Sequence, residues 1–423
     1  GLRRGGSSYY ALNVSDPTAL PRLAWTISPE PAGDFQELGL TFSTPLVARV
    51  QYEQSPRDVL VFGGGYNGGW NSSGAARTGK DLNAADDARG NAIYIVDARS
   101  GELIWKAVLG VTGSTTNRRY EHAGLVDSIP SRVAGLTTGQ GILHRLYVGD
   151  TGGALWRVDL PPGEDENQRR DHWLISKLAD LGADAAEPGG SAQRDLRFFH
   201  APELVQSFDA GGKFDGILIH SGNRAHPGEE VVENHLFYVK DREVISGSDK
   251  VKAENAALNP LGRYQFEDLA EQTGCITGTE VLATAEDGLN CAQMLTPNGW
   301  KLMYERPGEK GLSRPLVDAG RVFATTYTPA ASTGCAPLEG QGHLYAIHLS
   351  DATALVGGVR VAELGPGIPA KALHLGQSIL LPGGGADLYD LDGDGKRDAS
   401  QLLPSQAHRR FRVYWRDPAM DPL

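Results

Sequence analysis

The sequence predicts an all-β fold of the propeller type, in which several small sheets follow one another around an axis. A strand–turn–strand phrase, N-A-I-Y-I-V-D-A-R-S-G-E-L-I-W at Asn91–Trp105, recurs along the chain in weaker forms. The 423 residues include 54 Gly and 24 Pro, which favour many tight turns, and long helical periodicity is scarce. A hairpin that recurs at blade-like intervals is the sequence signature of a β-propeller.

The weaker copies of the phrase share an apolar strand followed by a short polar turn. They lie at Tyr9–Trp25, Leu146–Leu160 and Leu344–Leu355, and His235–Asp241 matches the first half of the phrase. Unrelated hairpins in a β-sandwich are the alternative explanation of the same pattern.

Each part of the phrase at Asn91–Trp105 has a mechanical reason. The run Ile93–Val96 is apolar on both faces of the strand, which suits a strand placed between neighbouring blades. Asp97 can accept hydrogen bonds from the backbone amides of the turn, and Gly101 supplies a positive φ without steric cost. Trp105 ends the return strand, where its ring could wedge between adjacent blades.

Further elements follow from local composition. Strands are expected at Asp58–Phe62, Gly216–His220, Leu302–Tyr304 and Arg321–Tyr327. Short helices are expected near Asp171–Leu181 and Glu267–Glu271. A last strand, Phe411–Trp415, is expected to pair with the N-terminal strands and close the ring, which would remove exposed edges.

No linker divides the chain, so residues 1–423 are expected to form a single propeller domain with loop insertions. The chain opens at Gly1 without Met, which predicts a fragment of a longer protein. It contains no apolar run long enough to span a membrane. The formal net charge of −12 argues against a nucleic-acid partner, because an acidic protein repels phosphates.

An acidic segment near the C-terminus matches the front of an EF-hand calcium loop. In D-L-D-G-D-G-K-R-D, carboxylates occupy the first, third, fifth and ninth positions, and a lysine carbonyl falls at the seventh. The predicted metal ligands are Asp390, Asp392, Asp394, Lys396 and Asp398. Crowded carboxylates repel one another without a cation, and their hard oxygen atoms favour Ca²⁺. The alternative is an acidic surface turn without a bound ion.

The calcium loop departs from the EF-hand pattern at its twelfth position. Gln401 stands there in place of the bidentate Glu, and the sequence predicts no flanking helices. We therefore expect water or another segment of the chain to complete the coordination shell.

The three cysteines carry no strong framework signal. Cys275 and Cys291 flank a polar loop and are candidates for a disulfide, which would stabilise the fold by about 3 kcal/mol in the chain-entropy model. Cys335 is then left over. Three unpaired thiols are the alternative.

The sequence offers no recognisable catalytic set. Its histidines are scattered, and neither an H-E-x-x-H zinc motif nor a G-x-S-x-G nucleophile elbow is present. The glycine cluster at Phe62–Trp70 lacks the Lys and Ser or Thr of a phosphate-binding loop. We therefore predict that the chain is not an enzyme.

Several short motifs, taken in order along the chain, resemble one known family. They lie at Arg3–Val14, Ser43–Val47, Val59–Tyr66, Gly90–Asp97, Ser128–Ser131, Leu146–Leu160, Ser221–Pro227, Asn298–Leu302, Gly308–Val317 and Thr325–Cys335. Together they resemble the C-terminal propeller domain of the PilY family, the tip-associated adhesins and assembly factors of bacterial type IV pili. The resemblance runs nearly end to end and finishes at F-R-V-Y-W-R-D, Phe411–Asp417.

The resemblance implies a modified, quinoprotein-like propeller of seven blades. It also implies an extracellular location at the pilus tip or outer membrane surface, and a part in pilus biogenesis, surface attachment, twitching motility and virulence. The expected partners are minor pilins of the tip complex and a host or abiotic surface. A calcium loop of this family precedes the L-Y-x-G-D strand, but here Leu136–His144 carries no carboxylate, so that site is expected to be lost.

Two other functions compete with a pilus module. A dehydrogenase dependent on pyrroloquinoline quinone is the main alternative, because Asp97-x-x-Ser100-Gly101-x-x-x-Trp105 resembles the tryptophan-docking phrase of those enzymes. Such enzymes often carry adjacent cysteines beside the quinone, and this chain has none. A carbohydrate-binding propeller is compatible with the aromatic residues but has no specific motif in its favour.

Overall fold

The computed structural model of the chain describes residues 1–52, 55–68, 80, 86–111, 113, 115–116, 118–161, 170–258, 262–271, 276–277, 280–281, 298–330, 339–355, 360–375, 378–380 and 402–404. Four larger sheets, named here the first to the fourth in chain order, form the body. The first sheet has the order β3-β4-β5-β6-β8-β7. Its strands are β3 (Leu46–Tyr52), β4 (Ser55–Gly63), β5 (Ala92–Asp97), β6 (Leu103–Leu109), β7 (Thr115–Thr116) and β8 (Arg119–His122).

The second and third sheets have the same plan of a four-stranded antiparallel meander with a short parallel strand added at one edge. The second sheet contains β9 (Ala134–Thr137), β10 (Leu143–Gly149), β11 (Ala154–Asp159), β12 (Leu174–Asp180) and the added β16 (Tyr264–Gln265). The third sheet contains β13 (Glu203–Asp209), β14 (Gly212–His220), β15 (His235–Asp241), β20 (Gly299–Met303) and the added β17 (Ala270–Glu271).

The fourth sheet and three small sheets complete the described strands. The fourth contains β21 (Lys310–Gly311), β22 (Leu316–Asp318), β23 (Arg321–Thr328), β24 (Gln341–His348) and β25 (Val361–Pro366). The small sheets pair β1 (Tyr9–Asn13) with β2 (Arg22–Ile27), β18 (Ile276–Thr277) with β19 (Glu280–Val281), and β26 (Leu373–Leu375) with β27 (Ser378–Leu380) and β28 (Leu402–Pro404).

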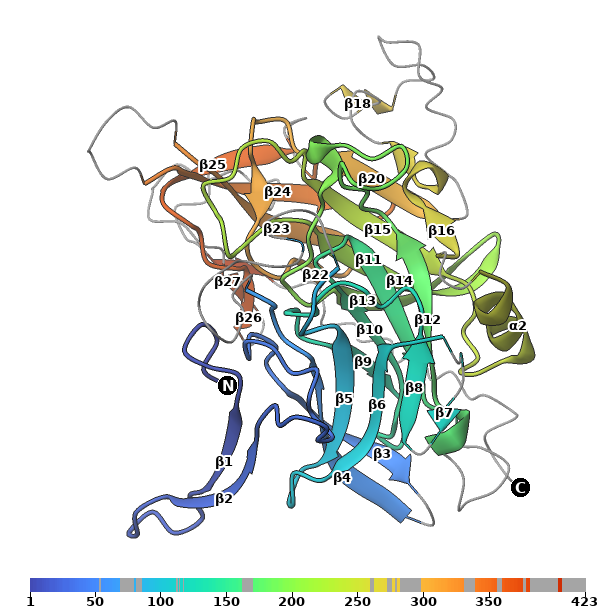
Figure 1. The fold of residues 1–423 in the computed structure, drawn as a ribbon. Coiled ribbons are helices and arrows are strands. Elements are labelled where there is room, and N and C mark those ends of the chain that lie inside the picture. The colour runs from blue at the N-terminus through green and yellow to red at the C-terminus, as the bar shows by residue number, and fades with distance from the viewer. Residues whose placement is uncertain are drawn as a thin grey trace.

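The four larger sheets follow one another in chain order through the body, from the blue first sheet to the orange fourth sheet (Figure 1). Helical structure is sparse in the described part of the chain and includes α2 (Asp249–Leu258) and short 3-10 turns such as Ala192–Arg194 and Phe266–Asp268. The predicted all-β, propeller-like fold is therefore confirmed. The prediction of seven blades remains a prediction.

Apolar cores lie between successive sheets, and the inner strands contribute to a core on each face. In β5, Ile93 and Ile95 face the core shared with the second sheet, whereas Tyr94 and Val96 face the core shared with the N-terminal ribbon β1–β2. This alternation is the strand geometry that the sequence predicted for a blade placed between two neighbours.

The tryptophan of the repeated phrase joins two blades. Trp105, on β6 of the first sheet, is fully buried and meets Trp173 edge-to-face, with 6.3 Å between ring centroids. Trp173 lies one residue before β12 of the second sheet. The wedge predicted for Trp105 is confirmed, and such ring pairs add about 0.5–1.5 kcal/mol beyond the area that they bury.

The turn between β5 and β6 also has the predicted chemistry. Asp97 Oδ1 accepts hydrogen bonds from the backbone amides of Arg99 and Ser100, at 2.8 and 3.0 Å. Gly101 has a φ of +75°, and a Cβ there would lie 2.8 Å from the ring of Trp25. The residue is therefore required to be glycine both by its backbone conformation and by the packing of the ribbon against the turn.

A buried ionic seam joins the second sheet to the third. Arg157 on β11 donates to Asp241 on β15 at 2.7 Å and to Asp159 at 2.7 Å. Arg145 on β10 forms an ion pair with Asp215 on β14. The five side chains are almost fully buried. Although burial by itself raises the pKa of the Asp241 carboxyl, the neighbouring arginines hold it below its ordinary value.

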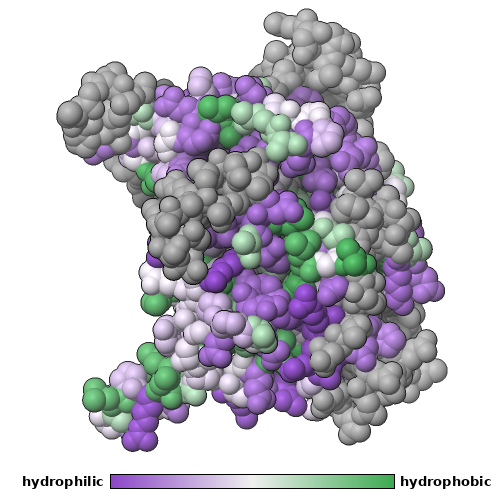
Figure 2. Space-filling model, in the orientation of Figure 1, coloured by the Kyte–Doolittle hydropathy of each residue, from purple (hydrophilic) through white to green (hydrophobic). Residues whose placement is uncertain are grey.

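The N-terminal ribbon β1–β2 projects from the body at the lower left of Figure 1. Its inner end is anchored by Tyr9 and Ile27, which are buried against the first sheet. Beyond them its apolar side chains are exposed, and Figure 2 shows them as green groups along the projection. The most exposed of these lie at the outer end, such as Leu20 at 88% and Leu23 at 60%.

Two local predictions are wrong. Asp171–Leu181 was expected to be helical, but Leu174–Asp180 forms β12, because its side chains are buried on both faces between two blades. Glu267–Glu271 was also expected to be helical, and it holds only the end of a 3-10 turn followed by β17. The predicted closing strand Phe411–Trp415 lies outside the described residues.

Candidate functional site

The motifs that carry the family resemblance meet in space, although they are far apart in sequence. Arg4 of the N-terminal motif donates to the carbonyl of Ala225, in the motif Ser221–Pro227, at 2.9 Å. Arg224 of that motif donates to the carbonyl of Leu312 at 2.7 Å, and Lys310 donates to the carbonyl of Pro227 at 3.1 Å. Side chains of one motif therefore hold the backbone of the next.

A second group of motifs meets around a buried serine. Ser43 donates from its hydroxyl to the carbonyl of Ser131 at 2.8 Å and accepts a hydrogen bond from the amide of Gly63 at 2.9 Å. The amide of Gly65 donates to the carbonyl of Ile129 at 3.0 Å. A Cβ at Gly63 or Gly65 would overlap the backbone of the facing segment, which explains the glycine-rich stretch as a close approach of backbones.

Lys80 lies at the centre of an acidic nest. Its side chain is 3% exposed, and its Nζ donates to Asp184 at 2.6 Å. Three further carboxylates lie within 4 Å of Nζ, those of Glu187 at 3.8 Å and of Asp127 and Asp195 at 3.9 Å. One ammonium thus stands where a free cation would otherwise be needed to separate four carboxylates.

Electrostatics fix the protonation of this nest. Burial by itself would lower the pKa of Lys80, but Asp127, Asp184 and Asp195 outweigh that effect and raise it. Burial, together with the charges of Asp150, Asp87 and Glu187, raises the pKa of Asp127 well above its ordinary value. A lysine with a raised pKa stays protonated at neutral pH, so Lys80 is suited to be a fixed cation and unsuited to be a nucleophile.

Asp150, in the motif L-Y-V-G-D-T-G-G-A-L-W, holds its own turn. Its carboxylate accepts hydrogen bonds from the amides of Gly152 and Ala154, at 2.9 and 2.8 Å, and from the indole of Trp156 at 2.6 Å. Burial raises the pKa of Asp150 to about 6. The role of this motif is therefore structural, like that of the Asp97 turn.

A small polar hollow of about 260 Å³ adjoins the nest. It is lined by Asp195 and Arg197 and by residues of the Ser221–Pro227 motif, including Asn223 and His226. The Asn223 side chain accepts from the amides of Ala225 and His226, at 3.0 and 3.2 Å, so it shapes its own loop. The Ser221–Pro227 motif therefore lines this hollow.

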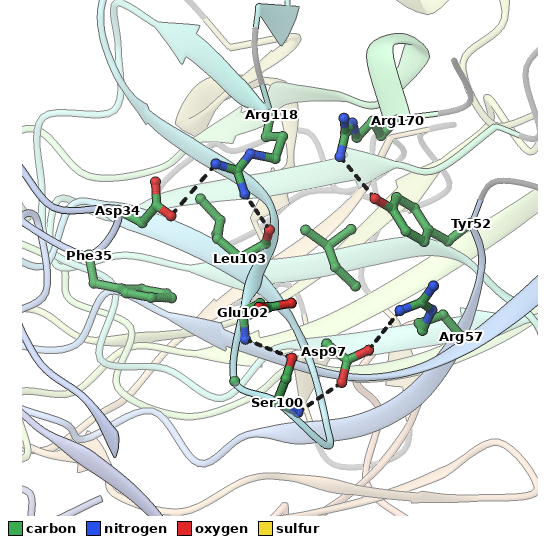
Figure 3. Close-up of a pocket in the computed structure, with 12 residues that line it drawn as sticks. Asp34, Phe35, Tyr52, Arg57, Asp97, Ser100, Glu102, Leu103, Arg118 and Arg170 are labelled. Carbon is green, nitrogen blue, oxygen red and sulfur yellow. Dashed lines mark hydrogen bonds and ion pairs between the residues drawn. The ribbon is translucent and has the colours of Figure 1, made fainter. Parts of the chain in front are cut away.

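A larger open hollow, here called the outer hollow, measures about 570 Å³ and lies beside the β5–β6 turn (Figure 3). Its charged lining consists of three arginines and three carboxylates, those of Arg57, Arg118, Arg170, Asp34, Asp97 and Glu102. Two rings, Phe35 and Tyr52, complete the walls. The lining comes from the β2–β3 loop, β3, β4, the β5–β6 turn and the segments before β8 and β12.

The three arginines of the outer hollow are held in place by hydrogen bonds and ion pairs that use only some of their N–H donors. Arg57 pairs with Asp97 at 3.1 Å, and Arg170 donates to the hydroxyl of Tyr52 at 2.9 Å. Arg118 donates to the carbonyl of Leu103 at 2.9 Å and lies 3.7 Å from Asp34 (Figure 3). Among the described residues, these contacts leave each guanidinium with further N–H donors that a ligand could meet.

The site residues predicted from sequence lie outside the described part of the chain. This holds for Asp390, Asp392, Asp394, Lys396 and Asp398 of the calcium loop, and for Cys275 and Cys291 of the disulfide candidate. Within the described residues, no group of three or more His, Cys, Asp or Glu side chains is arranged to hold a metal ion.

The segment Leu136–His144, where the family's calcium ligands would be expected, forms the hairpin between β9 and β10. The amide of Thr138 donates to the carbonyl of Ile142 at 2.7 Å, and the Thr138 hydroxyl accepts from the amide of Ile142 at 3.3 Å. His144 Nδ1 lies 3.0 Å from the hydroxyl of Ser246, and burial lowers the pKa of His144 to about 4. The turn thus closes through its own polar groups and offers a neutral imidazole in place of carboxylates.

Sequence reasoning missed the nest and the outer hollow. Lys80 and Asp184 are 104 residues apart, and the lining of the outer hollow comes from six segments. Of these two features, local sequence predicts only the Asp97-x-x-Ser100-Gly101 turn, which supplies one wall of the outer hollow.

Comparison with known proteins agrees with the motifs. The chain is 24% identical over 381 residues to a type IV pilus biogenesis factor PilY1 homolog of Xylella fastidiosa, covering 86% of this chain and 22% of that protein. It is 31% identical over 163 residues to the type IV pilus biogenesis factor PilY1 of Pseudomonas aeruginosa, covering 38% of this chain and 11% of that protein. No protein-family model matches the chain.

A solved structure has the same fold. The crystal structure of the C-terminal domain of Pseudomonas aeruginosa PilY1 superposes with a TM-score of 0.59 at 18% identity, covering 90% of this chain and 78% of that one. The predicted resemblance to a PilY-family C-terminal domain is confirmed by these relatives. The chain spans less than a quarter of the length of the curated relatives that it matches.

Proposed function

We propose that this chain, as a relative of the PilY C-terminal domain, is a non-enzymatic, calcium-binding module of a type IV pilus biogenesis factor. In this role it supports pilus assembly, surface attachment and twitching motility, and through them virulence. The curated relatives that it matches are named as type IV pilus biogenesis factors, which supports the coarser part of the proposal.

One observation carries the proposal furthest. The family motifs are the segments whose side chains bond one another across the fold, as in the contacts of Arg4 with Ala225 and of Arg224 with Leu312. The charged side chains at these contacts donate to backbone carbonyls. Lys80, the buried ammonium of the acidic nest, stays protonated. A permanently protonated lysine favours a structural role over a catalytic one.

The proposed location is extracellular, at the pilus tip or the outer membrane surface, as part of the fimbrium. The proposed partners are minor pilins of the tip complex and a host or abiotic surface. The described residues include no helix long and apolar enough to cross a membrane. The net charge of −12 continues to disfavour nucleic acid.

The proposed cofactor is Ca²⁺, held by Asp390, Asp392, Asp394 and Asp398 with the carbonyl of Lys396. The support is the spacing of the carboxylates and the glycine at the sixth position. A bound ion there would neutralise mutual repulsion and order a late segment of the chain. It would act at a different place from the Leu136–His144 hairpin, which has no carboxylate to offer.

The decisive experiment removes residues 1–423 from the natural protein in the bacterium that encodes it. Loss of surface pili, measured by immunoblot of sheared pilin, and loss of the twitching zone are expected. Re-expression of the intact protein should restore both, and a matched Arg49→Gln variant should restore them equally, because the Arg49–Asp58 pair is exposed. Normal pili and twitching after the deletion would overturn the proposal.

The alternative, a dehydrogenase dependent on pyrroloquinoline quinone, rests on the Asp97–Trp105 phrase. In this fold Asp97 ties a turn and Trp105 fills the interface between two blades, so packing accounts for both residues. Purified protein supplied with the quinone, calcium and an alcohol should reduce no dye. Sustained dye reduction would favour the alternative.

A further inference from the structure

The outer hollow is a built pocket on the first sheet. Part of its lining sits on β3, β4 and the tight turn held by Asp97, whose carboxylate accepts hydrogen bonds from two backbone amides. A pocket whose walls are fixed before binding loses little conformational entropy when a ligand arrives. We propose that the outer hollow binds a neutral carbohydrate.

The charge of the hollow favours a neutral ligand over an ionic one. Its three arginines are matched by three carboxylates, so the lining has no net charge to attract an anion or a cation. Arg57 and Asp97 already neutralise each other at 3.1 Å. A charged ligand would have to break such a pair, whereas an uncharged one can bind beside it.

The donors and acceptors alternate in the way that hydroxyl groups require. A guanidinium only donates and a carboxylate only accepts, whereas a sugar hydroxyl does both. Arg118 and Asp34 lie 3.7 Å apart, beyond direct hydrogen-bond distance, so a hydroxyl can accept from one and donate to the other. The free donors of Arg57 and Arg170 and the exposed carboxylate of Glu102 extend this lining.

Shape and apolar surface fit the same ligand class. The volume of about 570 Å³ lies within the range of small-molecule sites, and the hollow is open, as suits a ligand that remains partly hydrated. In Figure 3 the ring of Phe35 points toward the middle of the hollow. Its position is fixed by Tyr94, at 5.3 Å between centroids, so it can receive the C–H face of a sugar ring.

This inference deepens the attachment part of the proposed function and rests on it for its biological meaning. Carbohydrate on a host surface would be the feature recognised. Binding itself, however, is a property of the purified chain and can be measured apart from pilus assembly.

The test begins with an array of neutral glycans, acidic glycans and short peptides probed with the purified 423-residue chain. Neutral glycans should be retained, and binding of the best one should be confirmed by titration calorimetry. Arg57→Gln and Arg170→Gln should each weaken that binding about tenfold or more, because each removes charged donors from the wall. Glu102→Gln should weaken it by removing a carboxylate acceptor.

Arg49→Gln is the matched control, because Arg49 also pairs with an aspartate on the first sheet but lies outside the hollow. It should bind like the unmodified chain. Melting curves should show that all variants are folded, because the Arg49–Asp58 pair is exposed and worth about 0–1 kcal/mol, and because loss of Arg57, whose side chain is 44% exposed, leaves Asp97 with its two backbone amide donors.

Several results would overturn the inference. They are the absence of any glycan hit, hits confined to acidic glycans with a steep salt dependence, hits confined to peptides, and equal weakening in the Arg49→Gln control. In the bacterium, the Arg57→Gln and Arg170→Gln variants should keep surface pili and lose adherence to a glycan-coated surface. If the chain binds no glycan while deletion of the domain still abolishes pili, the proposed carbohydrate site is wrong and the proposed pilus function is still supported.

Discussion

Replacing Lys80 by methionine tests whether the acidic nest depends on its built-in cation. Methionine keeps most of the length and apolar body of lysine and removes only the charge. The substitution leaves Asp184, whose side chain is 4% exposed, without the ammonium that lies 2.6 Å away. It also leaves Asp127, Glu187 and Asp195 facing one another across the same space.

The expected cost follows from these distances. At an effective dielectric constant of about 20, one pair of charges about 4 Å apart attracts by about 4 kcal/mol. Much of that gross attraction offsets desolvation, and removing one partner from a buried pair has a net cost of about 3–5 kcal/mol. For 423 residues, roughly 2.1 cal/mol/K per residue gives an unfolding entropy of about 0.9 kcal/mol/K. A loss of about 4 kcal/mol therefore lowers the Tm by about 4–5 °C.

The assay is thermal unfolding followed by circular dichroism at pH 7.5 and at pH 5. The deficit of Lys80→Met should be smaller at pH 5, because uncompensated carboxylates take up protons there. Lys252→Met is the matched control, since the Lys252 side chain is 48% exposed and its pair with Asp249 is 3.6 Å long. The control should melt within about 1 °C of the unmodified protein.

A double variant separates charge from packing. Lys80→Met combined with Asp184→Asn should lose less stability than the sum of the two single changes, because the pair is removed together. If Lys80→Met melts at the unmodified temperature, or if its deficit does not depend on pH, the reasoning about the nest is wrong.

Three further outcomes are expected. The buried imidazoles of His220 and His235 have pKa values lowered by burial to about 4, against about 6.5 when unfolded, so their stabilisation is complete above pH 6.5 and is lost as pH falls toward 4. Each of these two histidines should lower the free energy of unfolding by about 2 kcal/mol at pH 5 relative to pH 7. A pH series of denaturant titrations would detect this loss, and an unfolding free energy that stays constant from pH 7 to 5 would contradict the prediction. Gly101→Ala should lower stability by about 1–3 kcal/mol, because its φ is +75° and the new methyl meets Trp25, whereas a substitution at exposed Ser100 should not. Asp392→Ala with Asp394→Ala should remove one bound Ca²⁺ per chain in calorimetry without global unfolding, and an unchanged stoichiometry would refute the calcium loop.

The blade-to-blade packing was predictable because its determinants are local. A continuous apolar run at Ile93–Val96, a turn aspartate at Asp97 and a terminal Trp105 each act within a few residues of their position in the sequence. Their structural roles follow from strand period and turn chemistry alone.

Other features, namely β12, α2 and the outer hollow, depend on contacts between residues far apart in sequence, which local sequence patterns do not predict. The segment Leu174–Asp180 has apolar residues at a spacing that fits either a helix or a strand, and burial between two blades selects the strand. The helix α2 lies outside both segments in which helices were expected, and Val251 is its fully buried side chain within the described residues. The charged lining of the outer hollow was hidden in the same way, because isolated arginines in polar segments resemble ordinary solvated residues.

The ionic seam between the second and third sheets has a consequence for engineering this fold. Arg145 and Arg157 come from one sheet, whereas Asp215 and Asp241 come from the next. A chimera that takes only one of these two blades from a relative with different seam residues would inherit an unmatched charge at a position buried from solvent. These two blades should therefore be transplanted as a single cassette, with cut points placed on either side of the pair.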